Sequence, residues 1–152
     1  MLKPKAGMAV SSFNEKYIFV IGGKAPKIKD FLSEVDVYDI TKDSWSQLNY
    51  LQTESCPAEG FYYSGAYQCS SREIMIIGGT TDQTRSDKSW MLDVTDGSLR
   101  EGPGLKQAGY FINSCYYVDG FLYAYGNEYG NQYYVHAFDC KTKEWRIEER
   151  TV

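Results

Sequence analysis

Apolar and polar positions alternate along much of this chain. Three short apolar runs stand out, and each is followed directly by glycine. Residues 17–21, 74–77 and 121–125 are such runs, and each reads as a buried strand of five or fewer residues. The glycine landmarks that follow them are Gly22-Gly23, Gly78-Gly79 and Gly126-Asn127. Their first members lie 56 (78 − 22) and 48 (126 − 78) positions apart. A period near 50 residues indicates a repeat architecture.

A second landmark keeps the same register in each copy. An aspartate follows an aromatic residue or leucine, and a tryptophan or leucine stands six residues after the aspartate. The three pairs are Asp39 with Trp45, Asp93 with Leu99, and Asp139 with Trp145. The agreement of two separate landmarks indicates three copies of one unit.

Each copy is expected to form four short strands joined by polar turns. The predicted strands are residues 7–13, 17–21, 34–40 and 45–48, then 61–69, 73–77, 89–94 and 99–102, then 109–118, 121–125, 133–139 and 145–148. Asp119-Gly120 is a strong signal for a two-residue hairpin turn. Aromatic residues make up 16% of the chain, 14 of them tyrosine, which favours strands. The fold class predicted is all-β.

The strand meander with these landmarks resembles the kelch repeat over nearly the whole chain. The residues that carry the resemblance are Gly22, Gly23, Tyr38, Asp39, Trp45, Gly78, Gly79, Asp93, Gly126, Asp139 and Trp145. The family implies a β-propeller of four-stranded antiparallel blades, here about 6–49, 60–103 and 107–148 within a partial propeller of residues 1–152. It also implies that large aromatics, such as Tyr38, Trp45, Phe138 and Trp145, fill the space between blades.

Three departures from the kelch pattern carry expectations of their own. Asn127 replaces a glycine, a mild change because asparagine tolerates left-handed backbone. Leu92 and Leu99 replace the aromatic residues of the second copy, which predicts a smaller wedge of side chains there.

Three blades correspond to half of a six-bladed ring, so two blade faces would lack a neighbour. Three interpretations follow. The sequence is a piece of a longer protein, or two copies close a ring, or the open faces pack on other subunits of an assembly. Each predicts a protein partner, because uncovered apolar faces favour association.

The overall charge and composition exclude several classes of partner. The net charge of −4 provides no general attraction for nucleic acid. No stretch is long and apolar enough to insert into a membrane, and no apolar signal segment follows the charged start. The four cysteines are not spaced as zinc ligands, which predicts reduced thiols and no metal. A cytoplasmic protein without a cofactor is expected, with the cytoskeleton as one candidate location.

Catalytic signals are weak. The only histidine, His136, lies in an alternating strand, where a packed structural role is expected. We therefore predict a non-catalytic scaffold for protein–protein interaction. Some kelch-type proteins are enzymes, so the alternative is part of a propeller enzyme or metal-dependent module whose catalytic residues lie on other blades or on a partner.

The loops between the second and third strands are the predicted binding surface. Their lengths differ between copies while the strands keep register, and binding residues are often carried by loops on a rigid scaffold. In kelch-like propellers these loops share one face. The candidate partner-binding residues are Lys24, Lys27, Lys29, Arg85, Tyr129 and Asn131.

Overall fold

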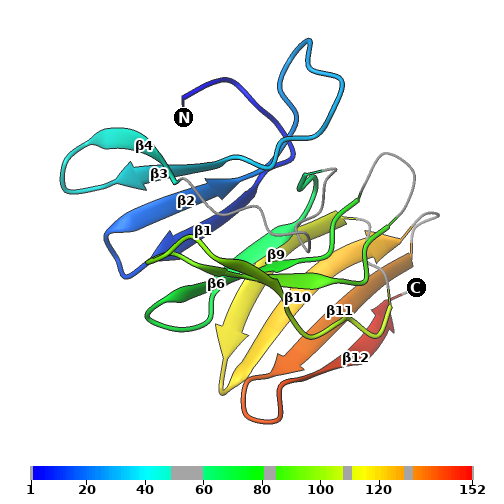
Figure 1. Ribbon diagram of the computed structural model, residues 1–152. Helices are drawn as coiled ribbons and strands as arrows, with labels where there is room; N and C mark the ends of the chain where they lie inside the picture. Colours follow the sequence, from blue (N-terminus) through cyan, green and yellow to red (C-terminus); the bar gives the residue numbers. More distant parts are fainter. Residues whose placement is uncertain (1, 49–59, 81–84, 108–110, 129–131, 152) are drawn as a thin grey trace.

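In the computed structural model, the described residues form twelve strands in three four-stranded antiparallel sheets and no helix (Figure 1). The structure describes residues 2–48, 60–80, 85–107, 111–128 and 132–151. The all-β prediction and the three four-stranded sheets are confirmed.

Each sheet is a meander in which strands pair in chain order. Blade 1 contains β1 (Ala9–Phe13), β2 (Tyr17–Ile21), β3 (Val35–Asp39) and β4 (Ser44–Leu48). Blade 2 contains β5 (Gly65–Gln68), β6 (Glu73–Ile77), β7 (Ser89–Asp93) and β8 (Leu99–Glu101). Blade 3 contains β9 (Phe111–Val118), β10 (Phe121–Glu128), β11 (Gln132–Asp139) and β12 (Glu144–Thr151).

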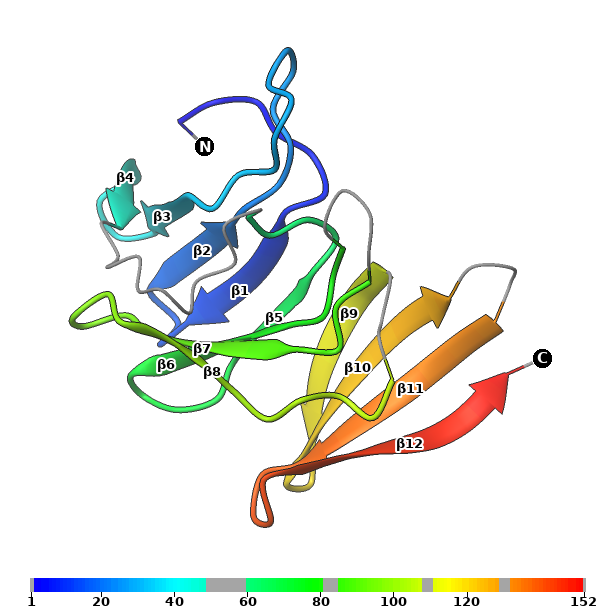
Figure 2. The same ribbon diagram turned by 45° about the vertical axis from the view of Figure 1, so that its right-hand side comes forward.

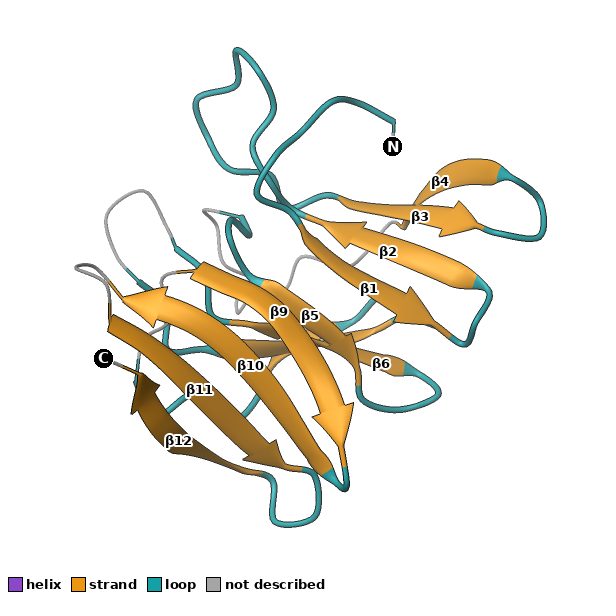
Figure 3. Ribbon diagram, turned by 180° about the vertical axis from the view of Figure 1, so that it is seen from behind, coloured by secondary structure: helices purple, strands orange, loops and turns teal. Residues whose placement is uncertain are grey.

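The three blades fan out from their first strands. Strand β5 contacts β1 on one side and β9 on the other, so the first strands of all blades lie at the centre. Strands β4 and β12 lie at the outer edges (Figures 2 and 3). This radial arrangement is that of neighbouring propeller blades.

Two apolar cores hold the blades together, one at each junction. Phe13, Phe19, Ile21, Val35 and Val37 of blade 1 pack against Ile74, Ile76, Trp90, Leu92 and Leu99 of blade 2. Met75, Ile77, Met91 and Leu105 pack against Ile112, Leu122, Ala124, Phe138 and Trp145 of blade 3. Successive side chains of a strand point to opposite faces, so alternate residues of β6 and β7 pack against blade 1 and against blade 3.

The expected aromatic wedge forms in blade 3. Phe138 and Trp145 are buried against blade 2, and the Trp145 indole Nε1 donates a hydrogen bond to the carbonyl oxygen of Pro103 at 3.0 Å. The rings of Tyr38 and Trp45 are tilted by 38° with centroids 5.0 Å apart, and both residues are only half-buried on the outer face of blade 1. That these two rings fill a space between blades stays a prediction, because no preceding blade is present among the described residues.

Blade 2 compensates for its two leucines with a tryptophan. Leu92 and Leu99 occupy the positions of Phe138 and Trp145, and Trp90 joins them in the core shared with blade 1. Trp90 is two residues before Leu92, so both side chains point to the same face of β7. The prediction of a smaller wedge is therefore wrong, because Trp90 supplies the aromatic bulk.

The diglycine pairs permit a backbone approach between blades. Gly22 and Gly23 have φ of 67° and 97°, and a Cβ on Gly22 would lie 2.2 Å from the carbonyl oxygen of Phe61. Gly79 has φ of 97°, and a Cβ there would lie 2.7 Å from the carbonyl oxygen of Tyr62. Glycine is needed at these positions both for the left-handed backbone and for the absent side chain.

The segment 61–63, which the pairs approach, bonds to all three blades. Phe61 N–H donates to the carbonyl of Leu32, and its own carbonyl accepts from Gly23 at 2.7 Å. The carbonyl of Tyr62 accepts from Thr80 in blade 2, and that of Tyr63 accepts from Ile112 in blade 3. We call residues 61–63 the hub segment. The prediction of a strand over 61–69 is wrong at its start, because β5 begins at Gly65.

The third glycine landmark behaves differently from the first two. Gly126 and Asn127 lie inside β10, which continues to Glu128 rather than ending near Tyr125. They pair with Tyr134 and Tyr133 of β11, after an irregularity in the pairing with β9. Neither residue has positive φ, so the left-handed conformation expected at Asn127 is absent.

The motif aspartates organise the turns between the third and fourth strands. The Asp39 carboxylate accepts from Thr41 N–H at 2.9 Å and from the Thr41 hydroxyl at 2.7 Å. Asp93 accepts the same two bonds from Thr95, and Asp139 accepts from Lys141 N–H at 2.7 Å. These bonds lower the pKa of all three carboxyl groups, because they favour the charged form.

Candidate interaction surface

The loop between β2 and β3 has a fixed backbone shape. Lys24 N–H donates to the carbonyl of Ala6 at 2.8 Å, and Ala6 N–H donates back to Lys24 at 3.0 Å. At the other end of the loop, Leu32 N–H donates to Gly23 at 2.8 Å. The tip turns at Lys27, which has φ of 67°. Figure 1 shows this loop projecting beyond the ends of the strands, near the N-terminus.

Three lysines expose their side chains on this loop. Lys24, Lys27 and Lys29 are all exposed, and none forms an ion pair with a described residue. The Lys24 ammonium lies 5.2 Å from the ring centroid of Phe31, a cation–π distance. The structure therefore gathers three of the predicted binding residues on one loop.

An aromatic pair supports this loop from behind. Phe31 stacks on Tyr62 with 4.4 Å between ring centroids and 17° between ring planes. Tyr62 lines a cavity of about 490 Å³ together with Pro4, Ala6, Ala25, Pro26 and Ile28, and with Lys5, Lys24 and Lys27. The sequence analysis missed Phe31, Ile28 and Tyr62. Apolar residues inside a lysine-rich loop were the available signal for Ile28 and Phe31.

The other predicted binding residues are placed differently. Arg85 is half-buried and forms an isolated bridge with Thr80, and it is not among the described residues that line the cavity. Tyr129 and Asn131 lie outside the described residues. We call Lys24, Lys27, Lys29 and the cavity beside them the lysine loop site.

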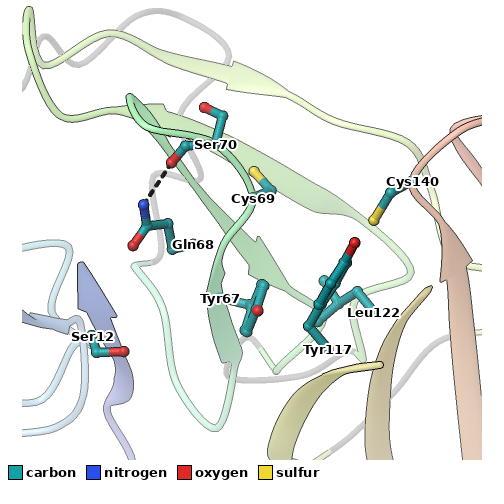
Figure 4. Close-up of a pocket in the computed structure, with 8 residues that line it drawn as sticks. All are labelled: Ser12, Tyr67, Gln68, Cys69, Ser70, Tyr117, Leu122 and Cys140. Atoms are coloured by element: carbon teal, nitrogen blue, oxygen red, sulfur yellow. Dashed lines mark hydrogen bonds between the residues drawn. The ribbon is translucent and has the colours of Figure 1, made fainter. Parts of the chain in front are cut away.

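A second cavity, of about 400 Å³, lies at the opposite end of blades 2 and 3 (Figure 4). It is lined by Ser12, Tyr67, Gln68, Cys69, Ser70, Tyr117, Leu122 and Cys140. The rings of Tyr67 and Tyr117 lie nearly parallel, with centroids 6.0 Å apart. Gln68 Nε2 donates to the carbonyl of Ser70 and to Asn14 Oδ1, which ties the turn of blade 2 to blade 1.

The thiols in and near this cavity are poorly suited to nucleophilic chemistry. Burial raises the pKa of Cys69 to about 11 and that of Cys115 to about 12, and it also raises the pKa of Cys140. These thiols stay protonated at neutral pH, and the thiolate is the reactive form. The three described cysteines are free, and Cys56 lies outside the described residues.

His136 is a packed strand histidine. Its side chain is 1% exposed, and it meets the Trp145 ring edge-on, at 84° and 6.4 Å. Its Nδ1 forms no hydrogen bond within the described part of the chain. Removal from water lowers the pKa of His136, because burial disfavours the imidazolium. Among the described residues, no group of three or more potential ligands could hold a metal ion.

The buried imidazole makes stability depend on pH in a defined window. Below the ordinary pKa of 6.5 the unfolded chain takes up a proton that the folded chain resists, so the free energy of unfolding falls as the pH decreases. Urea unfolding at about pH 7.5 and about pH 5.5 should show this loss in the native protein and a much smaller one in His136→Phe. An equal loss in both proteins would contradict the assignment, because His136 is the only histidine.

Two sheet faces have no neighbouring blade among the described residues. On blade 1 the N-terminal segment partly covers the face with an ion pair between Lys5 Nζ and Asp36 Oδ2, 3.0 Å apart, in which both side chains are fully buried. On blade 3, Tyr116, Val118 and Tyr125 are exposed on the face away from blade 2. Both faces of blade 2 are packed against a neighbouring blade, so these two faces are the ones that lack such a neighbour.

Comparison with known proteins agrees with this geometry. The radial sheets, the positive-φ glycines and the aspartate-capped turns define blades of the β-propeller class. Residues 4–52, which include blade 1, match the family model of the Kelch motif. This match identifies a kelch motif in the first third of the chain, and blades 2 and 3 repeat its four-stranded meander. None of the curated proteins matches it. Within its described residues, no helix is long and apolar enough to cross a membrane.

Proposed function

We propose that the protein is a non-catalytic scaffold for protein–protein interaction that binds its partner at the end carrying the lysine loop site. The observation that supports this best is the loop between β2 and β3. Its backbone is fixed by hydrogen bonds to Ala6 and Gly23, yet its lysine side chains remain exposed and unpaired within the described residues. A loop whose backbone is already ordered loses less conformational entropy when it binds a partner.

The open faces support a place in a larger propeller or assembly. Tyr38 and Trp45 occupy the positions whose equivalents in blades 2 and 3 pack against the preceding blade. Covering such faces removes apolar surface from water, at roughly 25 cal/mol per Å². The partner at these faces is the rest of a longer chain, a second copy or another subunit. The free thiols of the described cysteines suit a reducing compartment, so we place the scaffold in the cytoplasm.

Cross-linking mass spectrometry in cells that express the protein tests this proposal. With a lysine-reactive reagent, we expect a stoichiometric partner protein linked through Lys24, Lys27 or Lys29. Lys141 and Lys143, exposed on the turn between β11 and β12 at the other end of blade 3, provide the internal comparison. Failure to recover a stoichiometric partner, or equal linkage at both ends, would contradict the proposal.

A further inference from the structure

We propose that the lysine loop site binds a short acidic peptide segment that carries an apolar side chain. This inference rests on the proposed function and names the chemistry of the partner. It joins three observations: the local positive charge, the apolar cavity next to it, and the fixed backbone that presents both.

The charge of the loop is opposite to that of the chain. Lys24, Lys27 and Lys29 lie within six positions, whereas the chain carries 20 acidic and 16 basic residues in total. Asp30 is the acidic neighbour on the same loop, so the segment 24–30 keeps a net charge of +2 (three Lys minus one Asp). A short acidic segment can contact the lysines of this loop without coming close to the acidic side chains on the rest of the surface. A long polyanion such as nucleic acid would meet that surface and be repelled.

The cavity provides the apolar half of the recognition. Ala6, Ala25, Pro26 and Ile28 contribute apolar surface, and Ile28 remains 40% exposed. A volume of about 490 Å³ accommodates one or two large apolar side chains. Lys24 and Lys27 line the same cavity, so an apolar side chain bound there would place flanking carboxylates next to the ammonium groups.

The loop is already held in the shape that binding requires. The paired hydrogen bonds between Lys24 and Ala6 fix one wall of the cavity, and Phe31 stacked on Tyr62 fixes the other side of the loop. Tyr62 is anchored in turn, because its carbonyl accepts from Thr80 at 2.9 Å. Little ordering of the loop is therefore needed when a peptide binds, which favours affinity.

Titration of the nitrogen-15-labelled protein with synthetic peptides tests the inference. The probe is an acetylated and amidated Glu-Glu-Leu-Glu-Glu peptide, with Lys-Lys-Leu-Lys-Lys and a Gln-flanked version as comparisons. We expect the acidic peptide alone to shift the amide signals of Lys24, Ile28 and Tyr62. Its affinity should fall about tenfold between low and high salt, because salt screens exposed charges.

A pair of matched charge reversals locates the site. Lys27→Glu with Lys29→Glu should weaken binding of the acidic peptide about tenfold or more, since the attraction becomes repulsion. Lys141→Glu with Lys143→Glu should leave binding unchanged. The control is closely matched, because Lys143 and Lys27 both have positive φ and all four lysines are exposed in turns or loops. Dispersed amide spectra verify that each variant is folded.

Several results would overturn the inference. These are equal binding of the acidic and basic peptides, signal shifts away from the loop, or equal effects of the two double variants. The outcome is separable from that of the proposed function. A partner that still co-purifies with the Lys27→Glu and Lys29→Glu variant would preserve the scaffold and reject the acidic peptide.

Discussion

Replacement of Gly22 by alanine should lower the free energy of unfolding by about 3–5 kcal/mol, a large part of the stability of a small domain. The left-handed backbone at this residue costs an L-amino acid about 1–2 kcal/mol. The new methyl group would also lie 2.2 Å from the carbonyl oxygen of Phe61, so the hub segment must move. That movement weakens the bond from Gly23 N–H to the same oxygen. Urea denaturation followed by tryptophan fluorescence measures the loss.

Gly120→Ala is the matched control for this prediction. Gly120 also has positive φ, of 88°, but a Cβ there meets no atom within 4 Å. Its replacement should cost only the conformational term, about 1–2 kcal/mol. Equal losses for Gly22→Ala and Gly120→Ala would show that close approach to the hub segment contributes nothing.

The substitution Trp145→Ala should destabilise the fold by about 3–5 kcal/mol. Trp145 is 2% exposed in the core between blades 2 and 3, and its ring packs at a 42° tilt against Phe138 with 5.1 Å between ring centroids. Its removal leaves a cavity and deprives the Pro103 carbonyl of a hydrogen bond at 3.0 Å. The midpoint of urea unfolding is the measurement.

Trp45→Ala tests the same motif position in a different environment. Trp45 is half-buried on the outer face of blade 1, so its loss should cost about 1 kcal/mol. A loss at Trp45 as large as that at Trp145 would mean that the outer face of blade 1 is covered in solution. Repeating the measurement at several protein concentrations distinguishes association from folding.

Local patterns were sufficient for most of the strand framework. The apolar runs before Gly22 and Gly78 end at the same residues as β2 and β6, Ile21 and Ile77. A strand buried on both faces needs such a continuous apolar run. The turn after Asp139 was equally readable. Aspartate, lysine and threonine at these positions favour a tight polar turn, which the carboxylate then caps.

Features that depend on contacts between blades could not be predicted from local sequence patterns. The hub segment, residues 61–63, has the composition of a strand, but its backbone groups bond to three different blades instead of a neighbouring strand. The packing of Trp90 against blade 1 follows from the face of β7 on which it lies, and no sequence landmark marks that face. A uniform repeat predicts a turn at Asn127, whereas β10 continues through it to Glu128.

The candidate site was predictable in its charge but not in its shape. The lysines at 24, 27 and 29 were visible as a cluster in the sequence. The stacking of Phe31 on Tyr62 joins residues separated by 31 positions (62 − 31), and no local pattern indicates it. The cavity beside the lysines depends on the same contact, together with the pairing of Ala6 and Lys24.

The hub segment has a consequence for how the protein unfolds. In linear repeat proteins each unit touches only its neighbours, so terminal units can open while the others remain folded. Here Phe61, Tyr62 and Tyr63 bond in turn to blade 1, to the loop after β6, and to Ile112 in blade 3. Opening any blade therefore breaks bonds to a segment that the other two also need. We therefore expect the three repeats to unfold as one cooperative unit centred on the hub segment.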